Sequence, residues 1–146
     1  MEQQKPKIYM VVGCPGAGKS WVCEQLTDKF TYVHHDGYIY LQKEKGPRAY
    51  VDEIIKAAAA STKPLLIEAP FSVSQTKDPL ESKGFDVTCV YIIENEDVIP
   101  ARYRKREGKD IPKGHITRQA TYRKRAEETK AFFGGSEEVL NHLKAV

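Results

Sequence analysis

The sequence lacks several features that would assign it to a specialised class of protein. Only three of its 146 residues are cysteine, and Cys14, Cys23 and Cys89 form no CxxC pair. Neither a disulfide framework nor a zinc site is therefore indicated. No apolar run approaches the ~20 residues that a membrane-spanning helix needs, and the N-terminal stretch MEQQKPKIYMVVG does not have the pattern of a secretion signal. These absences predict a cytoplasmic protein without a membrane partner.

Length and composition are otherwise ordinary. With 40% hydrophobic and 29% charged residues, the chain can build a proper hydrophobic core. Disorder, collagen and coiled coil are disfavoured by the same composition. We find no internal repeat, low-complexity segment or interdomain linker. The sequence predicts a single domain over residues 1–146, and it leaves the oligomeric state open.

The net charge of +3 hides an asymmetry along the chain. Residues 102–130 hold eleven Lys and Arg against four Asp and Glu, a local net charge of +7, which leaves −4 for the remainder. A cationic block on an otherwise acidic body suggests that the block meets phosphates. A solvated helical face would have the same composition, so charge alone leaves both interpretations open.

Short apolar runs alternate with helical patterns. Runs rich in β-branched residues and bounded by Gly or Pro are typical of buried strands, whereas apolar residues three and four positions apart are typical of helices. Strands that alternate with helices form a parallel sheet covered on both faces. The pattern predicts an α/β three-layer sandwich with about four parallel strands. The predicted strands are residues 7–12, 31–34, 64–70 and 85–93, and the predicted helices are 18–30, 48–60, a segment after Asn95, 116–133 and 136–145.

The strongest signal is the glycine cluster between the first strand and the first helix. GCPGAGKS fits G-x-x-x-x-G-K-[S/T], and it stands between a strand and a helix as that motif requires. Glycines let successive backbone N–H groups point inward at an anion, the lysine reaches the β- and γ-phosphates, and the serine hydroxyl ligates Mg²⁺. The motif predicts a P-loop NTPase fold that binds a nucleoside triphosphate. The predicted nucleotide-binding residues are Gly13, Cys14, Pro15, Gly16, Ala17, Gly18, Lys19 and Ser20, with Ser20 also the metal ligand.

Other sequence features narrow the class of P-loop protein. An AAA-type ATPase is disfavoured because the third strand ends LLIEAP rather than in Asp-Glu and because the chain is short. A GTPase is disfavoured because there is no Asn-Lys-x-Asp motif. The basic, Gly- and Pro-punctuated segment in the C-terminal third is typical of a kinase lid, which excludes water so that hydrolysis does not compete with transfer. These features favour a kinase.

Asp36 is a candidate general base. It follows the second predicted strand, so it falls on the same edge of the sheet as the P-loop. A carboxylate there can accept the proton of an attacking hydroxyl and direct its oxygen at the γ-phosphorus. The alternative is that Asp36 caps a short helix that begins at Gly37. Position alone leaves both interpretations open.

Together these residues resemble a known family. GCPGAGKSW, an aspartate about sixteen residues beyond the P-loop serine, and RYRKREGKDIP with a basic helix after it are similar to the kinase domain of bacteriophage-type 5′-polynucleotide kinase. The resemblance spans nearly the whole chain and is strongest in two blocks, the P-loop and a lid at residues 102–125. It implies a transfer of the γ-phosphate of ATP to the 5′-hydroxyl of DNA or RNA. It also implies ATP and Mg²⁺ as cofactors, a nucleic-acid partner, and the host cytoplasm if the protein is viral.

The resemblance further implies roles for single residues. Lys19, Asp36 and Arg106 take the catalytic positions, with Asp36 as the general base and Arg106 as the arginine that neutralises the transferring phosphoryl group. Arg102, one helical turn earlier, takes a second basic position that faces the same way. Ile39 departs from the family, which has an arginine there to hold the phosphate on the 3′ side of the acceptor. Glu68 stands roughly where the family has an acid that pairs with that arginine.

The acceptor therefore remains open at this stage. A kinase for a hydroxymethylated base in viral DNA would need the same donor residues, and so would a small-molecule kinase for a nucleoside, nucleotide or metabolite. A hydrolytic or non-catalytic ATP-binding module is a further alternative. Of the aromatic residues, Trp21 is expected to pack in the core, and Tyr38 could equally well stack on a base. His34 and His35 are expected to be bystanders.

Overall fold

The computed structural model describes residues 5–13, 17–34, 48–68, 73–94, 97–111 and 113–146, apart from the side chains of residues 115 and 116. Strands and helices alternate along these ranges, as the sequence predicts. The strands are β1 (Ile8–Val12), β2 (Thr31–Val33), β3 (Leu65–Glu68), β4 (Val87–Ile92) and β5 (Phe132–Gly134); the helices are α1 (Lys19–Glu24), α3 (Arg48–Ala60), α4 (Val73–Ser82), α5 (Val98–Glu107), α6 (Lys113–Thr129) and α7 (Ser136–Ala145).

All five described strands are parallel and lie in the order β2-β3-β1-β4-β5. The central strand β1 pairs with β3 on one side, where Ile8 lies opposite Leu65, and with β4 on the other, where Ile8 lies opposite Val87. The sequence predicts the three-layer sandwich correctly. Its count of about four strands is one short, because β5 lies where the sequence predicts the end of a helix.

Lys130 accounts for the missed strand. It has a positive φ of 56°, which ends α6, and the next N–H, that of Ala131, donates to the carbonyl of Ala126 at 3.0 Å. This hydrogen bond closes the helix in the way that a glycine usually permits. Because a lysine takes the left-handed position, no glycine marks the boundary in the sequence. The chain then enters β5 at Phe132, two residues before the first of the two glycines.

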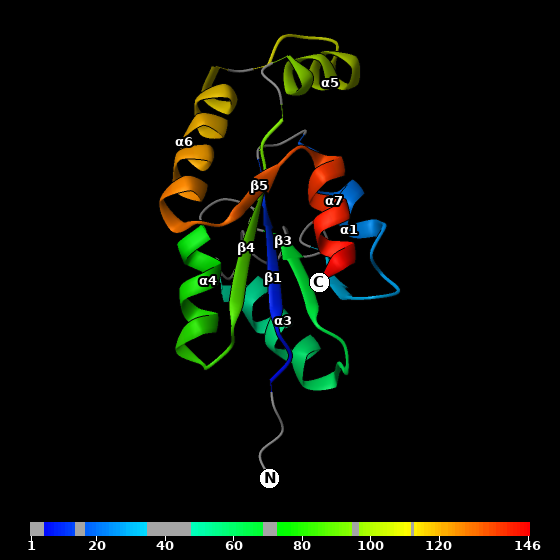
Figure 1. Cartoon of the computed structure of the whole chain (residues 1–146), viewed down its shortest axis with the longest axis vertical. Coiled ribbons are helices and arrows are strands. Elements are labelled where there is room, and N and C mark those ends of the chain that lie inside the picture. The colour runs from blue at the N-terminus through cyan, green and yellow to red at the C-terminus, as the bar shows by residue number, and fades with distance from the viewer. Residues whose placement is uncertain (1–4, 14–16, 35–47, 69–72, 95–96, 112) are drawn as a thin grey trace.

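Helices cover both faces of the sheet (Figure 1). Helix α1 packs against α7 on one face, and α3 packs against α4 on the other, where α6 also lies over β4 and β5. All residues of β1 and β3 are buried, as expected of strands covered on both sides. None of the described helices is both long and apolar enough to cross a membrane.

Helices α1 and α4 depart from the prediction, and α5 agrees with it. Helix α1 ends at Glu24 rather than near residue 30, and turns lead from there to β2. Helix α4 was not predicted, because its sequence is largely polar and contains Pro79, yet it buries Val73, Thr76 and Leu80. Helix α5 tolerates Pro100 because proline needs no N–H donor in the first turn.

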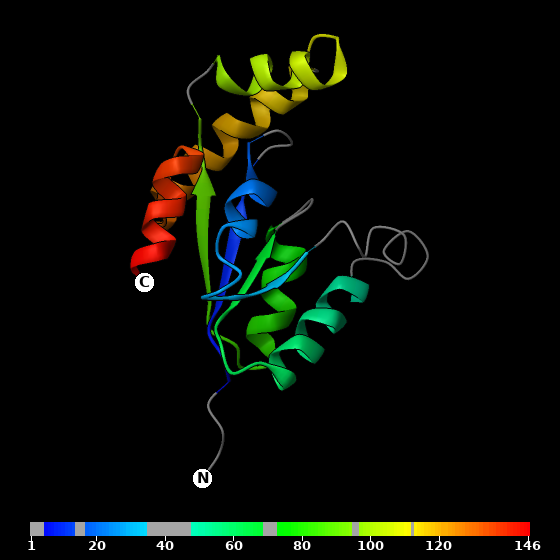
Figure 2. The ribbon, with the colours of Figure 1, turned by 90° about the vertical axis from the view of Figure 1, so that its right-hand side faces the viewer.

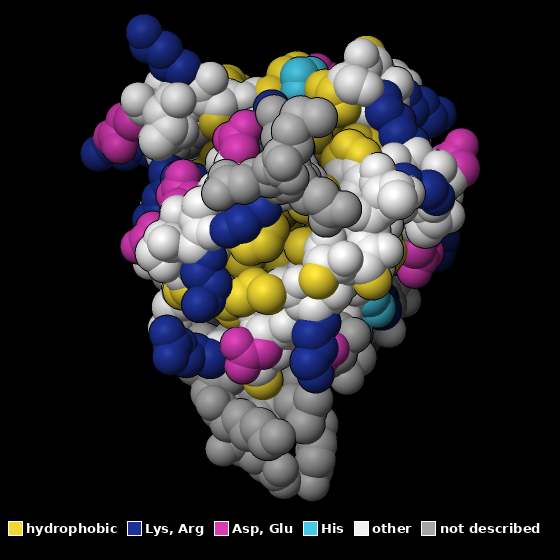
Figure 3. All heavy atoms as spheres, turned by 90° about the horizontal axis from the view of Figure 1, so that it is seen from below, with side chains coloured by type: hydrophobic (Ala, Val, Ile, Leu, Met, Phe, Trp, Pro, Cys, Tyr) yellow, Lys and Arg dark blue, Asp and Glu magenta, His cyan; other side chains and the backbone are white. Residues whose placement is uncertain are grey.

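The two ends of the sheet differ in character. Figure 2 shows α5 and the beginning of α6 standing beyond the carboxyl ends of the strands. At the amino ends, Lys5, Lys7 and Lys29 lie over aromatic rings, and Figure 3 shows Lys and Arg side chains around apolar surface on that side. Ligands of open α/β sheets bind outside the carboxyl ends of the strands. The segment over those ends, α5 and α6, contains the predicted lid.

Candidate functional site

The P-loop connects the end of β1 to the start of α1. Gly18 precedes α1 with a φ of 98°, a conformation that favours glycine. A Cβ atom on Gly13 would lie 3.1 Å from the Cβ of Ala17, so the loop closes tightly on itself. The Lys19 ammonium donates to the carbonyl of Gly13 at 2.6 Å. The side chain of the predicted phosphate-binding lysine therefore reaches back from the start of α1 to the first residue of the motif.

Ser20 meets a buried carboxylate. Its hydroxyl donates to Glu68 Oε1 at 3.2 Å and lies 3.4 Å from His34 Nε2. Glu68, at the end of β3, is 4% exposed, and its other oxygen lies 3.9 Å from His34 Nε2. The ends of β2 and β3 and the start of α1 thus contribute to one polar cluster next to the P-loop. The sequence singled out both Glu68 and His34, but expected His34 to be a bystander; its contacts place it in this cluster.

Two tyrosines adjoin this cluster, the buried Tyr50 and the half-buried Tyr32. The Tyr50 hydroxyl donates to the carbonyl of Val33 at 2.7 Å and accepts from the N–H of Glu68 at 3.1 Å, so it joins the ends of β2 and β3. The Tyr32 hydroxyl is buried and has no hydrogen-bond partner within the described residues. Burial, followed by the nearby Cys23 and Glu68, raises the pKa of Tyr32 far above its usual range, so this phenol stays neutral.

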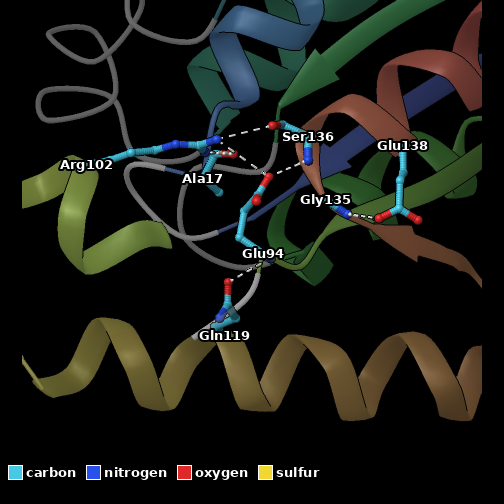
Figure 4. A network of polar contacts seen from close by, with 7 residues as sticks. All are labelled: Ala17, Glu94, Arg102, Gln119, Gly135, Ser136 and Glu138. Atoms are coloured by element: carbon cyan, nitrogen blue, oxygen red, sulfur yellow. Dashed lines mark hydrogen bonds and ion pairs between the residues drawn. The ribbon is translucent and has the colours of Figure 1, made fainter. Parts of the chain in front are cut away.

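The lid reaches the P-loop through Arg102. This arginine of α5 donates to the carbonyl of Ala17 at 3.1 Å and to Ser136 Oγ at 3.5 Å, and it lies 3.8 Å from Glu94 Oε1 (Figure 4). The contacts surround a cleft of about 580 Å³, and Trp21 lines it. The expectation that Trp21 packs in the core is wrong, since it is 44% exposed at this cleft. Trp21 lies in the first turn of α1, and the next two residues of that helix, Val22 and Cys23, are buried.

The remaining predicted residues are not brought together in the same way. Arg106 donates to Glu107 at 3.0 Å and lies over the ring of Tyr103, so both of these contacts are within its own helix. Asp36 lies outside the described residues. The same holds for Cys14, Pro15 and Gly16 of the P-loop, and for His35, Tyr38 and Ile39.

Three residues of the site were missed by the sequence analysis. Glu94 comes two residues after β4, Gln119 lies on α6, and Ser136 is the first residue of α7, yet all three join the network around Arg102. One signal was available: an acidic residue at the carboxyl end of a parallel strand falls on the ligand-binding edge, as Glu68 does. Nothing in the sequence indicates that Gln119 and Ser136 meet it.

A second cavity lies away from this site. It has a volume of about 800 Å³ and is lined by residues of α4, β4, α6 and β5, including Lys77, Cys89 and Arg125. None of the predicted site residues lines it. The smaller cleft at the P-loop is the candidate site because the phosphate-binding motif and the lid arginine meet there.

Comparison with solved structures shows the P-loop kinase fold. The tunicamycin resistance protein of Deinococcus radiodurans superposes with a TM-score of 0.66 at 16% identity, over 97% of this chain and 95% of that one. A chain of the Pnkp1/Rnl/Hen1 RNA repair complex superposes with a TM-score of 0.67 at 20% identity, over 88% of this chain and 47% of that one. At these identities the likeness concerns the fold.

Two comparisons of sequence are more specific. The UMP-CMP kinase of Xenopus laevis is 32% identical over 72 residues, which span 49% of this chain and 37% of that kinase. The match thus covers well under half of the relative's length. A family model described as AAA domain matches residues 2–107, from before β1 to the end of α5. Because this match covers most of the chain and contains the P-loop, the chain belongs to the AAA domain family, a class that the end of the third strand and the short chain had disfavoured.

Proposed function

We propose that the protein is an ATP-dependent kinase that transfers the γ-phosphate to a hydroxyl group on a nucleic acid, with the 5′-hydroxyl of DNA or RNA as the acceptor. The observation that carries the proposal is the contact of Arg102 with the carbonyl of Ala17. It joins a phosphate-binding loop to a helix that opens a strongly basic segment. Residues 1–146 would form one kinase domain, with residues 102–125 as its lid.

On the donor side, the P-loop backbone from Gly13 to Ser20 would hold the phosphates. Lys19 would release the carbonyl of Gly13 and contact the β- and γ-phosphates, where a positive charge stabilises the transition state. Arg102 lines the cleft beyond the loop and would contact the donor nucleotide there. The exposed indole of Trp21 at the same cleft offers a surface for stacking on a base.

The residues around Ser20 fit a bound Mg²⁺ ion. Ser20 would provide the direct ligand, and the buried carboxylate of Glu68, 3.2 Å from that hydroxyl, would hold the ion's water shell together with the buried hydroxyl of Tyr32. No cluster of three or more His, Cys, Asp or Glu occurs within the described residues, which suits an ion that keeps several waters and binds through phosphates. When bound, Mg²⁺ would neutralise charge on the phosphate oxygens.

On the acceptor side, Asp36 would accept the proton of the attacking hydroxyl, and Arg106 would neutralise the transferring group when the lid closes. Part of the lid charge is paired, as in the contacts of Arg104 with Asp110 and of Arg123 with Glu127. Other cations of the lid are exposed and have no carboxylate partner within the described part of the chain. They suit a polyanionic acceptor. They are Lys105, Lys109, Arg118 and Lys124.

Two observations favour a second candidate, a kinase for small molecules. Ile39 stands where the resembled family has an arginine for the acceptor's phosphate, and the matched relative is named for the mononucleotides UMP and CMP. A nucleoside, nucleotide or metabolite would then be the acceptor, and a hydroxymethylated base in viral DNA is a further variant. The match to the AAA domain family suggests a third possibility to be tested, which is that the protein hydrolyses ATP without transferring the phosphate to an acceptor.

One panel of substrates separates these functions. The protein is incubated with γ-labelled ATP and Mg²⁺ and with a 5′-hydroxyl oligonucleotide, the same oligonucleotide carrying a 5′-phosphate, UMP, CMP, or no acceptor. We expect label on the 5′-hydroxyl oligonucleotide and none on its phosphorylated counterpart. Faster labelling of a mononucleotide would move the assignment to a small-molecule kinase, and phosphate release that no acceptor changes would move it to an ATPase.

The salt dependence of acceptor binding tests the role of the lid. On single strands, log K should fall by about 0.7 per contacted phosphate for each tenfold rise in salt. Replacing Lys109 and Lys124 together with alanine should weaken oligonucleotide binding and flatten this slope, with little effect on ATP. Lys144→Ala, at an exposed site near the end of α7, is the matched control. An unchanged slope in the double variant would contradict a nucleic-acid track on the lid.

A further inference from the structure

Glu94 lies where the lid, the P-loop and the beginning of α7 meet (Figure 4). It follows β4, lines the cleft at the P-loop, and has a side chain that is only 11% exposed. A carboxylate removed from water to this degree needs partners for its charge. Its contacts supply them from α7 and α5.

The carboxylate of Glu94 has two partners. It accepts a hydrogen bond from the backbone N–H of Ser136, the first residue of α7, and it lies 3.8 Å from the guanidinium of Arg102. Another nitrogen of the same guanidinium donates to the carbonyl of Ala17 in the P-loop. The guanidinium of Arg102 therefore bridges the carboxylate of Glu94 and the nucleotide-binding loop.

The backbone of Glu94 adds a contact to the second lid helix. Its N–H donates to the side-chain carbonyl of Gln119 on α6 at 3.2 Å. One residue thus connects α5 through its side chain and α6 through its main chain.

The start of α7 packs closely against the P-loop and Glu94. A Cβ atom on Gly18 would lie 3.3 Å from the Cβ of Ser136, and one on Gly135 would lie 3.3 Å from Glu94 Oε1. The N–H of Gly135 is already bound by Glu138 at 3.2 Å. Negative charge at the amino end of a helix is favourable, which fixes Glu94 and Glu138 there.

We propose that Glu94 is a positioning residue for the nucleotide donor. It holds Arg102 against the P-loop and keeps the cleft between the loop, the lid and α7 in the arrangement that accepts ATP. The inference rests on the proposed function as far as ATP is the donor, and it does not depend on the acceptor. Loss of Glu94 removes a charged partner of Arg102 while its contacts with Ala17 and Ser136 remain, so the guanidinium is held less firmly and ATP must supply more of its ordering.

The test compares three variants of the full chain. Glu94→Ala removes both side-chain contacts, Glu94→Gln keeps an oxygen for the N–H of Ser136 but loses the charge that attracts Arg102, and Glu24→Gln removes one exposed charge from α1 as the control. ATP binding with Mg²⁺ is followed by the fluorescence of Trp21, which is the single tryptophan of the chain, and by calorimetry. Thermal unfolding and the rate of tryptic cleavage of the lid are measured on the same samples.

We expect Glu94→Ala to raise the Kd for ATP about tenfold to hundredfold, the range for a charge-assisted hydrogen bond. Glu94→Gln should raise it about twofold to fivefold, as for loss of a partly exposed ion pair. Lid cleavage should accelerate in the same order, and Glu24→Gln should match the unmutated protein. With an active acceptor, KM for ATP should rise while kcat at saturating ATP falls less than about threefold.

Three outcomes would overturn the inference. If the variant melts at a lower temperature but its Kd for ATP, measured well below that temperature, is unchanged, Glu94 has a purely structural role. A lower Kd in Glu94→Ala would mean that Glu94 competes with ATP for Arg102. A lower kcat with an unchanged Kd would place it in the chemistry. If the unmutated protein transfers phosphate to no acceptor, the proposed function fails, while the binding and cleavage measurements still decide this inference.

Discussion

Replacing Tyr50 with phenylalanine removes one hydroxyl group that joins two strands beside the candidate site. In the folded protein this hydroxyl donates to the carbonyl of Val33 and accepts from the N–H of Glu68, and the Tyr50 side chain is fully buried. Phenylalanine has the same shape, so the variant leaves packing intact. Two backbone groups lose a partner that water cannot replace.

The expected loss of stability follows from these two groups. A buried donor or acceptor left without a partner costs about 1–3 kcal/mol. For Tyr50→Phe we expect the free energy of unfolding to fall by about 2–4 kcal/mol, a large effect for one oxygen atom. Because the hydroxyl also anchors the strand end that presents Glu68, the variant should gain less thermal stability from Mg²⁺ and ATP.

Tyr32→Phe is the matched control. The Tyr32 hydroxyl is buried near Ser20 and has no hydrogen-bond partner within the described residues. Removing it should leave the stability of the free protein unchanged or raise it by up to about 1 kcal/mol. Urea unfolding of both variants, followed by circular dichroism, gives the two values. Equal losses in the two variants, or a larger loss for Tyr32→Phe, would refute the assignment of hydrogen bonds around Glu68.

The remaining predictions concern catalysis and pH. Lys19→Ala should abolish transfer to every acceptor in a labelled-ATP assay, since a main phosphate contact is lost; near-normal turnover would reject the P-loop assignment. Asp36→Asn should retain ATP binding and lose about 10²–10⁴-fold in transfer rate, whereas a mere helix cap would leave the rate unchanged. Arg106→Ala should lower kcat more than Arg106→Lys does, because lysine lacks the planar fork; a change confined to KM would make Arg106 a ground-state contact. Burial raises the pKa of Cys89 to about 11, so its contribution to stability is present below its ordinary pKa of 9.0 and is lost as the pH rises from there through 11. Cys89→Ala should lose less stability than the unmutated protein between pH 8 and pH 11 in urea titrations.

The parts of the fold that follow from the sequence depend on local patterns. The P-loop is read directly because its glycines, lysine and serine occur at fixed spacing, and Gly18 takes the positive φ that this motif requires. Strands β1 to β4 can be predicted from apolar runs bounded by Gly, Pro or polar residues. Strand β5 could not be predicted, because the boundary before it depends on Lys130 in a conformation that usually belongs to glycine.

The parts of the site that could not be predicted depend on contacts between distant elements. The contact of Arg102 with Ala17 joins residues far apart in sequence, and Glu94 acquires its partners only when α6 and α7 pack at the end of β4. Trp21 was misplaced for a related reason. Trp21 stands next to the buried residues Val22 and Cys23 in the sequence, but its own side chain lies on the exposed side of α1 and lines the cleft.

The position of β1 has a consequence for how the chain folds. The strand comes first in the sequence and yet takes the middle of the sheet, with Leu65 and Val87 as the partners of Ile8. During synthesis its apolar side chains have no neighbouring strand until β3 has emerged, and they are flanked on both sides only after β4. Pairings between such distant segments slow folding. The apolar strand that carries the nucleotide-binding loop therefore lacks both of its neighbouring strands until β3 and β4 have been synthesised. An unpaired apolar strand of this kind makes the nascent chain prone to aggregation.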